Sequence, residues 1–139
     1  MNRDFRVGQS NELIKGGHIY DLHNCFDFDG LDVSEAGGLC LTFKPNVTHG
    51  NVYSSVRVIA HGVDRLVVSS GFGPTTVRDL EEIGYKSFGD EDEDWLLSQS
   101  QATLSDDLFF RFNDGHYIRF HSRSASLIET PRSLESPPS

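Results

Sequence analysis

Apolar and polar side chains alternate along much of the chain, which is the pattern of strands with one buried face. The clearest case is 108–120, where LFFRF and HYIRF flank Asn113-Asp114-Gly115. This arrangement predicts a hairpin with Gly115 at a positive φ. Alternation and β-branched content predict further strands. These cover residues 18–28, 39–43, 52–60, 64–70 and 126–129.

One segment instead shows helical spacing. Thr76 is a suitable N-cap with Asp79 three residues later, and Gly84 is a suitable end. An apolar stripe between them is formed by Val77, Leu80 and Ile83. We therefore expect a short helix over 76–84. A single helical turn is also expected over 10–15, stopped by the glycine pair that follows it.

These elements define the fold class. One helix cannot supply the crossovers that a parallel sheet needs. We expect a β-rich α+β protein with an antiparallel six- to seven-stranded sheet or sandwich and one short helix. Residues 1–130 are expected to form a single globular domain, and the Pro- and Ser-rich segment 131–139 a disordered C-terminal tail.

Charge is unevenly distributed along the chain. The protein has 21 acidic and 12 basic residues, a net charge of −9. Residues 79–107 hold ten of the acids and one base, Lys86, which leaves 11 acids and 11 bases elsewhere. Nucleic acid is therefore an unsuitable partner, because binding phosphates needs a basic stripe. A concentrated negative field favours a basic partner.

The centre of this field is an unbroken acidic run. It consists of Asp90, Glu91, Asp92, Glu93 and Asp94, and Trp95 follows directly. One interpretation is a solvated, mobile loop, since blocks of like charge repel. The other is a partner-binding face, because tryptophan is enriched at interface hot spots. A buried Trp95 would favour a third interpretation, in which it belongs to the core.

Three arginines of the C-terminal hairpin bear on the same question. Arg111, Arg119 and Arg123 are placed to pair with Asp106 and Asp107 or with the acidic run itself. Such pairing would reduce the net field.

Metal binding is not expected. His18 and His23, like His116 and His121, are five residues apart, and an odd spacing on a strand points side chains to opposite faces. The acidic run matches the first ligand positions of an EF-hand. Trp95, however, takes the position of the required glycine, and Gln101 replaces the bidentate glutamate.

Cofactor and catalytic motifs are also incomplete. The segment SSGFGPTTV (69–77) has two glycines but neither the third glycine of a dinucleotide fingerprint nor a P-loop lysine. No nucleophile elbow of the G-x-S-x-G kind occurs. We therefore predict no cofactor and no catalytic residue, and an enzyme is the less favoured class.

In its size, acidity, β-rich layout and Asp90–Asp94 cluster the chain resembles the small immunity proteins that bacteria keep beside polymorphic or contact-dependent toxins. The resemblance covers residues 11–129, with LCLTF and VRVIAHGVDRLVV as core strands. It implies stoichiometric binding to a basic toxin domain, often a nuclease. Asp90 to Asp94 would steer the partner and Trp95 would anchor it.

Two other classes stay open. The first is a small ligand-binding or enzymatic domain with a cavity lined by His61, Asp64 or the pair Asp27 and Asp29. The second is an assembly subunit that associates through strand edges. The opening residues carry charges and no apolar run, and no ~18-residue apolar stretch occurs. A cytoplasmic location without membrane contact is therefore expected.

Overall fold

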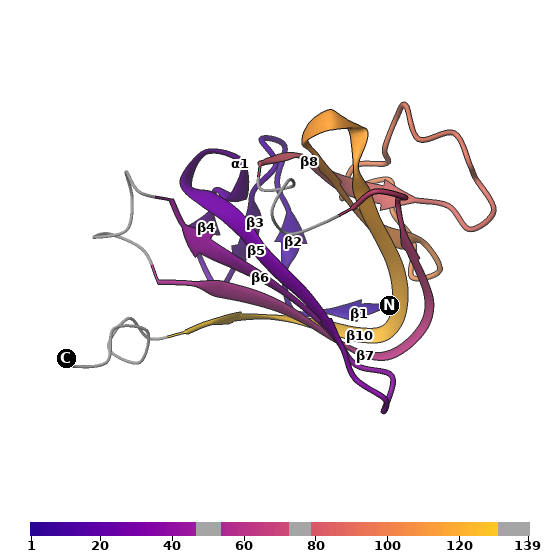
Figure 1. Cartoon of the computed structure of the whole chain (residues 1–139), viewed down its shortest axis with the longest axis horizontal. Helices are drawn as coiled ribbons and strands as arrows, with labels where there is room; N and C mark the ends of the chain where they lie inside the picture. Colours follow the sequence, from indigo (N-terminus) through magenta and orange to yellow (C-terminus); the bar gives the residue numbers. More distant parts are fainter. Residues whose placement is uncertain (47–53, 73–78, 131–139) are drawn as a thin grey trace.

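The computed structural model describes residues 1–46, 54–72 and 79–130, and its architecture confirms the expected fold class (Figure 1). It consists mostly of antiparallel strands with one short helix. The strands are β1 (Asn2–Arg3), β2 (Arg6–Val7), β3 (Leu13–Lys15), β4 (His18–Tyr20), β5 (Phe26–Val33), β6 (Leu39–Pro45), β7 (Val56–Val68), β8 (Leu80–Lys86), β9 (Asp107–Phe112) and β10 (Tyr117–Glu129). The helix α1 spans Leu22–Cys25, and a 3₁₀ turn spans Asn113–Gly115. Within these described ranges, no helix has the length and apolarity needed to cross a membrane.

The strands form two sheets. The larger has the order β5-β6-β7-β10-β9-β8, and β1 adds to β10 in parallel. This sheet curls into a half-barrel, and the smaller sheet β2-β3-β4 lies inside the curl (Figure 1). The small sheet was not expected from the pattern, because its strands are only two or three residues long.

The curl comes from two long bent strands, β7 and β10 (Figure 1). Two separate strands were expected at 52–60 and 64–70, but residues 56–68 form one strand that bends at Gly62, with φ of 67°. The pairing register with β10 shifts by one residue just beyond this glycine. Bends and bulges of this kind increase twist and allow one strand to serve two parts of a curved sheet. Residues 52 and 53 of the expected strand lie outside the described residues.

The helix predicted over 76–84 is wrong in its described part, because residues 80–86 form strand β8. Leu80 pairs with Phe112 and Ile83 pairs with Phe110, so two core positions three residues apart on β8 face partners only two apart. The register shift after Leu80 is a β-bulge, and the extra residue converts a strand's spacing into a helix-like one. The predicted N-cap, Thr76, lies outside the described residues.

The N-terminal third also differs from the prediction. No helical turn forms over 10–15, since residues 13–15 are strand β3 and Asn11 has a positive φ of 60°. The predicted strand 18–28 is interrupted by α1, whose N-cap Asp21 accepts a hydrogen bond from the backbone N–H of Asn24 at 3.0 Å. Such capping satisfies an otherwise free donor and starts the helix there.

The hairpin predicted over 108–120 is confirmed. β9 and β10 pair in antiparallel register around the 3₁₀ turn, and Gly115 has φ of 77°. The expected last strand at 126–129 is the end of β10. The tail predicted at 131–139 lies outside the described residues.

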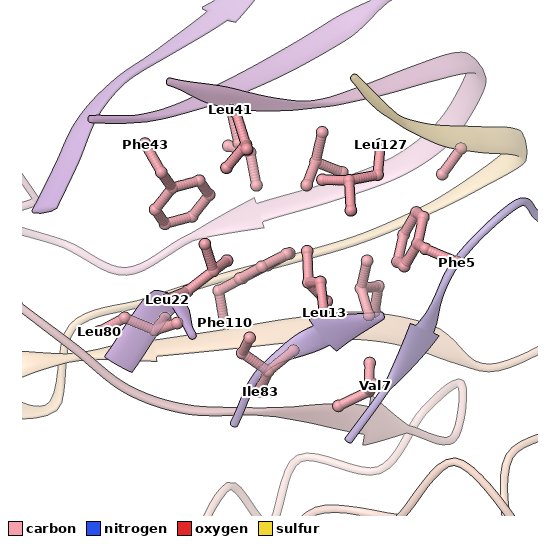
Figure 2. Close-up of a cluster of buried hydrophobic side chains, with 14 of the residues drawn as sticks. Phe5, Val7, Leu13, Leu22, Leu41, Phe43, Leu80, Ile83, Phe110 and Leu127 are labelled. Carbon is pink, nitrogen blue, oxygen red and sulfur yellow. The ribbon is translucent and has the colours of Figure 1, made fainter. Parts of the chain in front are cut away.

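The core fills the space between the half-barrel and the small sheet. In Figure 2 Val7 and Leu13 of the small sheet lie in one cluster with residues of the large one. The large sheet contributes Leu41, Phe43, Leu80, Ile83, Phe110 and Leu127, all buried. Because successive side chains of a strand point to opposite faces, the outer face of β8 and β9 carries the alternate positions, which are Gly84, Lys86, Phe109 and Arg111. That outer face carries the candidate site.

Candidate functional site

The acidic run belongs to a loop, residues 87–97, that we call the acidic loop. It follows β8 and extends outward from the curled sheet (Figure 1), and its last two residues return to line a cleft shared with β2. Its end is fixed to β8, where the backbone N–H of Leu97 donates to the carbonyl of Tyr85 at 2.8 Å and the reverse bond measures 3.0 Å. Gly84 makes this approach possible, because a Cβ there would lie 2.7 Å from the Cβ of Leu96.

Three cations on the outer face hold the backbone of the acidic loop. Each donates from its side chain to main-chain carbonyls. The donors and acceptors are Lys86 with Trp95 (2.6 Å), Arg119 with Asp90 (2.8 Å) and Ser87 (3.2 Å), and Arg111 with Glu93. Charge-assisted bonds to several carbonyls fix the course of a loop that its own charge would otherwise expand. The acidic loop is therefore a layer on the sheet.

Lys86 is the centre of this layer. Its side chain is 0% exposed, and its Nζ lies 3.6 Å from the centroid of the Trp95 ring and 3.4 Å from a carboxylate oxygen of Asp90. Trp95 remains 47% exposed, so the indole covers the ammonium group with one face and leaves part of its surface to solvent. Trp95 is therefore not buried in the core, but it is in contact with the sheet through Lys86.

The five carboxylates of the run have different roles. Asp90 and Asp92 stabilise the loop, since each accepts a hydrogen bond from a backbone N–H two residues later, at 2.9 and 3.1 Å. The bond from Asp92 is the main reason why the pKa of Asp90 lies below its ordinary value, with Lys86 adding to it. Glu91 and Asp94 are exposed, and within the described residues neither carboxylate has an ion-pair or hydrogen-bond partner.

Glu93 lines the same cleft as Tyr117 of β10. Burial, followed by the Glu93 carboxylate, raises the pKa of Tyr117. The carbonyl of Glu93 is bound by Arg111, and its carboxylate acts electrostatically on the sheet through Tyr117.

The arginines predicted to pair with acids are partly used in this way. Asp107 is buried and accepts from Arg119 at 2.9 Å and from Arg65 at 2.7 Å. Arg111 pairs with Glu82 at 3.2 Å, whereas Arg123 is exposed. The acidic loop and the ion pairs around it therefore include seven carboxylates and four cations. The carboxylates are the five of the run, Glu82 and Asp107, and the cations are Arg65, Lys86, Arg111 and Arg119. The field is still negative, but weaker than the chain segment 79–107 alone indicated.

Phe88 was not singled out from the sequence, although it stands close to the acidic run. It is 69% exposed, and the guanidinium of Arg65 lies 4.3 Å from its ring centroid. An aromatic on each side of a carboxylate run was the available signal. No sequence signal linked Arg65 to this site, because Arg65 lies more than twenty residues from Phe88 along the chain.

The residues of the alternative cavity do not come together. His61 lines an open groove of about 450 Å³ beside the end of β5, the start of β6 and the middle of β7. Asp64 is elsewhere, with its Oδ1 2.7 Å from Nδ1 of His121, and this hydrogen bond lowers the pKa of Asp64.

Asp27 and Asp29 both lie on β5, where Asp29 forms an exposed ion pair with Lys44 at 3.2 Å. In the ranges that the structure covers, no three His, Cys, Asp or Glu side chains are close enough to hold a metal ion.

Comparisons with protein-family models, curated proteins and solved structures found no match to this chain. The site's geometry is therefore the basis for the functional proposal.

Proposed function

We propose that the protein is an acidic binding module that neutralises a basic protein, as an immunity protein neutralises a toxin domain, in the cytoplasm. One observation carries this proposal: the acidic loop has its backbone carbonyls bound by cations of the sheet, while Glu91, Asp92 and Asp94 are exposed beside a half-exposed Trp95.

The arrangement suits tight binding for a physical reason. A free acidic loop would lose backbone conformational entropy when a partner ordered it, at about 1–2 kcal/mol for each residue fixed. Here the backbone is already fixed by the cations beneath it. The remaining negative field steers a basic partner, and an accessible indole supplies apolar contact area.

Affinity capture from the native host tests the proposal. The protein is immobilised, and we expect a basic protein to be retained at physiological salt and released as salt rises. The double variant Glu91→Gln/Asp94→Asn should weaken retention, because it removes two exposed charges that the loop's own hydrogen bonds do not use.

The matched control is Asp32→Asn/Glu35→Gln, which removes the same charge from exposed positions at and beyond the end of β5. Equal retention by the two double variants would show that only total charge matters. Capture of no basic protein by the unmodified chain would overturn the proposal.

A further inference from the structure

A cleft of about 440 Å³ opens between the start of the acidic loop and the outer face of β7 and β10. Its lining includes Val67, Phe88, Glu91, Glu93, Tyr117 and Arg119. This volume lies within the range of about 300–1,000 Å³ typical of sites that bury a ligand group.

The cleft also has apolar and aromatic wall residues, and two of them are unusually open to solvent. Phe88 is 69% exposed and Val67 is 45% exposed, although both are large hydrophobic residues. Tyr117 adds an aromatic surface that is held in place by stacking on Phe109, with ring centroids 5.1 Å apart and planes 16° apart. A fixed aromatic wall of this kind suits the aliphatic stem or the flat face of a ligand group.

The cations in the cleft are already used. Arg119 donates to Asp107 and to loop carbonyls, and Arg65 donates to Asp107 and to the carbonyl of Ser105. They are thus not available to an anionic ligand.

The carboxylates at the edge of the cleft are less fully used. Glu93 lines the cleft with no side-chain ion pair to the described residues, and Glu91 is exposed without a partner among them. Both carboxylates line the cleft together with Tyr117. The groups in the cleft that can still form hydrogen bonds are therefore acceptors, the carboxylates of Glu91 and Glu93.

We propose that this cleft receives an arginine side chain of the basic partner, with its guanidinium on the open face of Phe88 and its N–H groups on Glu91 and Glu93. This deepens the proposed function and rests on it. Arginine fits better than lysine, because its planar group stacks on aromatic rings and binds carboxylates in a fork. The chain already uses this contact, since Arg65 lies over Phe88 and Arg111 over Phe109, 5.4 Å from the ring centroid.

The test needs no identified partner. The isotopically labelled protein is titrated with three capped peptides, Gly-Arg-Gly, Gly-Lys-Gly and Gly-citrulline-Gly, and backbone amide shifts are followed by NMR. We expect saturable shifts at Val67, Phe88, Glu91 and Tyr117 with the arginine peptide, weaker ones with lysine and none with citrulline. Shifts spread equally over all acidic surfaces, or equal responses to arginine and lysine, would overturn the inference.

Two variants separate the roles of ring and charge. Phe88→Ala should weaken the arginine peptide about two- to fivefold, the effect of an exposed cation–π contact, whereas Phe88→Leu should recover only the part that is due to apolar area. The matched control is Ile19→Ala, which shortens a side chain of similar exposure, 62%, on β4. Unchanged binding by Phe88→Ala would overturn the inference.

The result can be distinguished from failure of the proposed function. If capture of a basic protein depends on Glu91 and Asp94 but is indifferent to Phe88→Ala, the binding function stands and the arginine cleft is wrong. If the peptide binds as expected but no basic protein is captured, the cleft stands and the proposed function is wrong.

Discussion

Gly84 is the position where one methyl group should detach the end of the acidic loop from the sheet. A Cβ at this residue would lie 2.7 Å from the Cβ of Leu96 and 3.0 Å from the carbonyl oxygen of Leu97. Overpacking of this kind costs about 1–3 kcal/mol. If the loop moves away instead, the two backbone hydrogen bonds between Tyr85 and Leu97 are lost, at about 1 kcal/mol each. Either way, Gly84→Ala should lower the free energy of unfolding by about 1–3 kcal/mol.

Urea denaturation followed by Trp95 fluorescence measures this change, and limited proteolysis reports whether the acidic loop has opened. The control is Gly30→Ala on β5, where an added Cβ meets nothing within 4 Å and φ is not left-handed. Restricting the unfolded chain should stabilise that variant slightly, by up to about 0.4–1 kcal/mol. Equal stability of the two variants would refute the close contact between Gly84 and the acidic loop.

Three further predictions concern the cations, the carboxylates and the indole. Because the pKa of Asp90 is depressed, its contribution to stability is present above the ordinary value of 3.8 and lost as pH falls through the lower folded value. Wild-type Trp95 fluorescence should therefore change below pH 3.8 by more than that of Asp90→Asn, and identical titrations would contradict this. Arg119→Ala should cost about 1.5–3 kcal/mol in thermal unfolding, because Arg119 is 8% exposed and donates to buried Asp107, which keeps Arg65 as its other partner; Arg123→Ala, an exposed control, should stay within about 0.5 kcal/mol. Trp95→Ala should weaken partner capture by about 2 kcal/mol or more, and retention equal to wild type would exclude an anchoring role.

The fold class followed from alternation alone, but the positions of the elements did not. Leu80 and Ile83 share a face in a bulged strand as they would in a helix, so spacing could not distinguish the two. The pairing with Phe112 and Phe110 decides for the strand, and it is a contact between residues about thirty positions apart. Two strands were expected to meet at Gly62, because a glycine that bends a continuous strand has the same local signature as a glycine that connects two strands.

The candidate site shows the same division between local and long-range information. The chain segment 79–107 contains a single base, and arginines of the C-terminal hairpin were the expected partners that could reduce its negative field. Curling of the sheet brings Arg119 from β10 and Arg65 from β7 beside the run. Arg119 was one of the expected partners, whereas the position of Arg65 could not be inferred without the strand order. These arginines bind mainly loop carbonyls and the buried Asp107 rather than the exposed carboxylates. They therefore lower the net field and at the same time fix the loop that carries it. For recognition of a basic partner, the fixed loop geometry offsets the reduction in net negative charge. Less conformational entropy is lost when the partner binds, and the exposed carboxylates remain free to contact it.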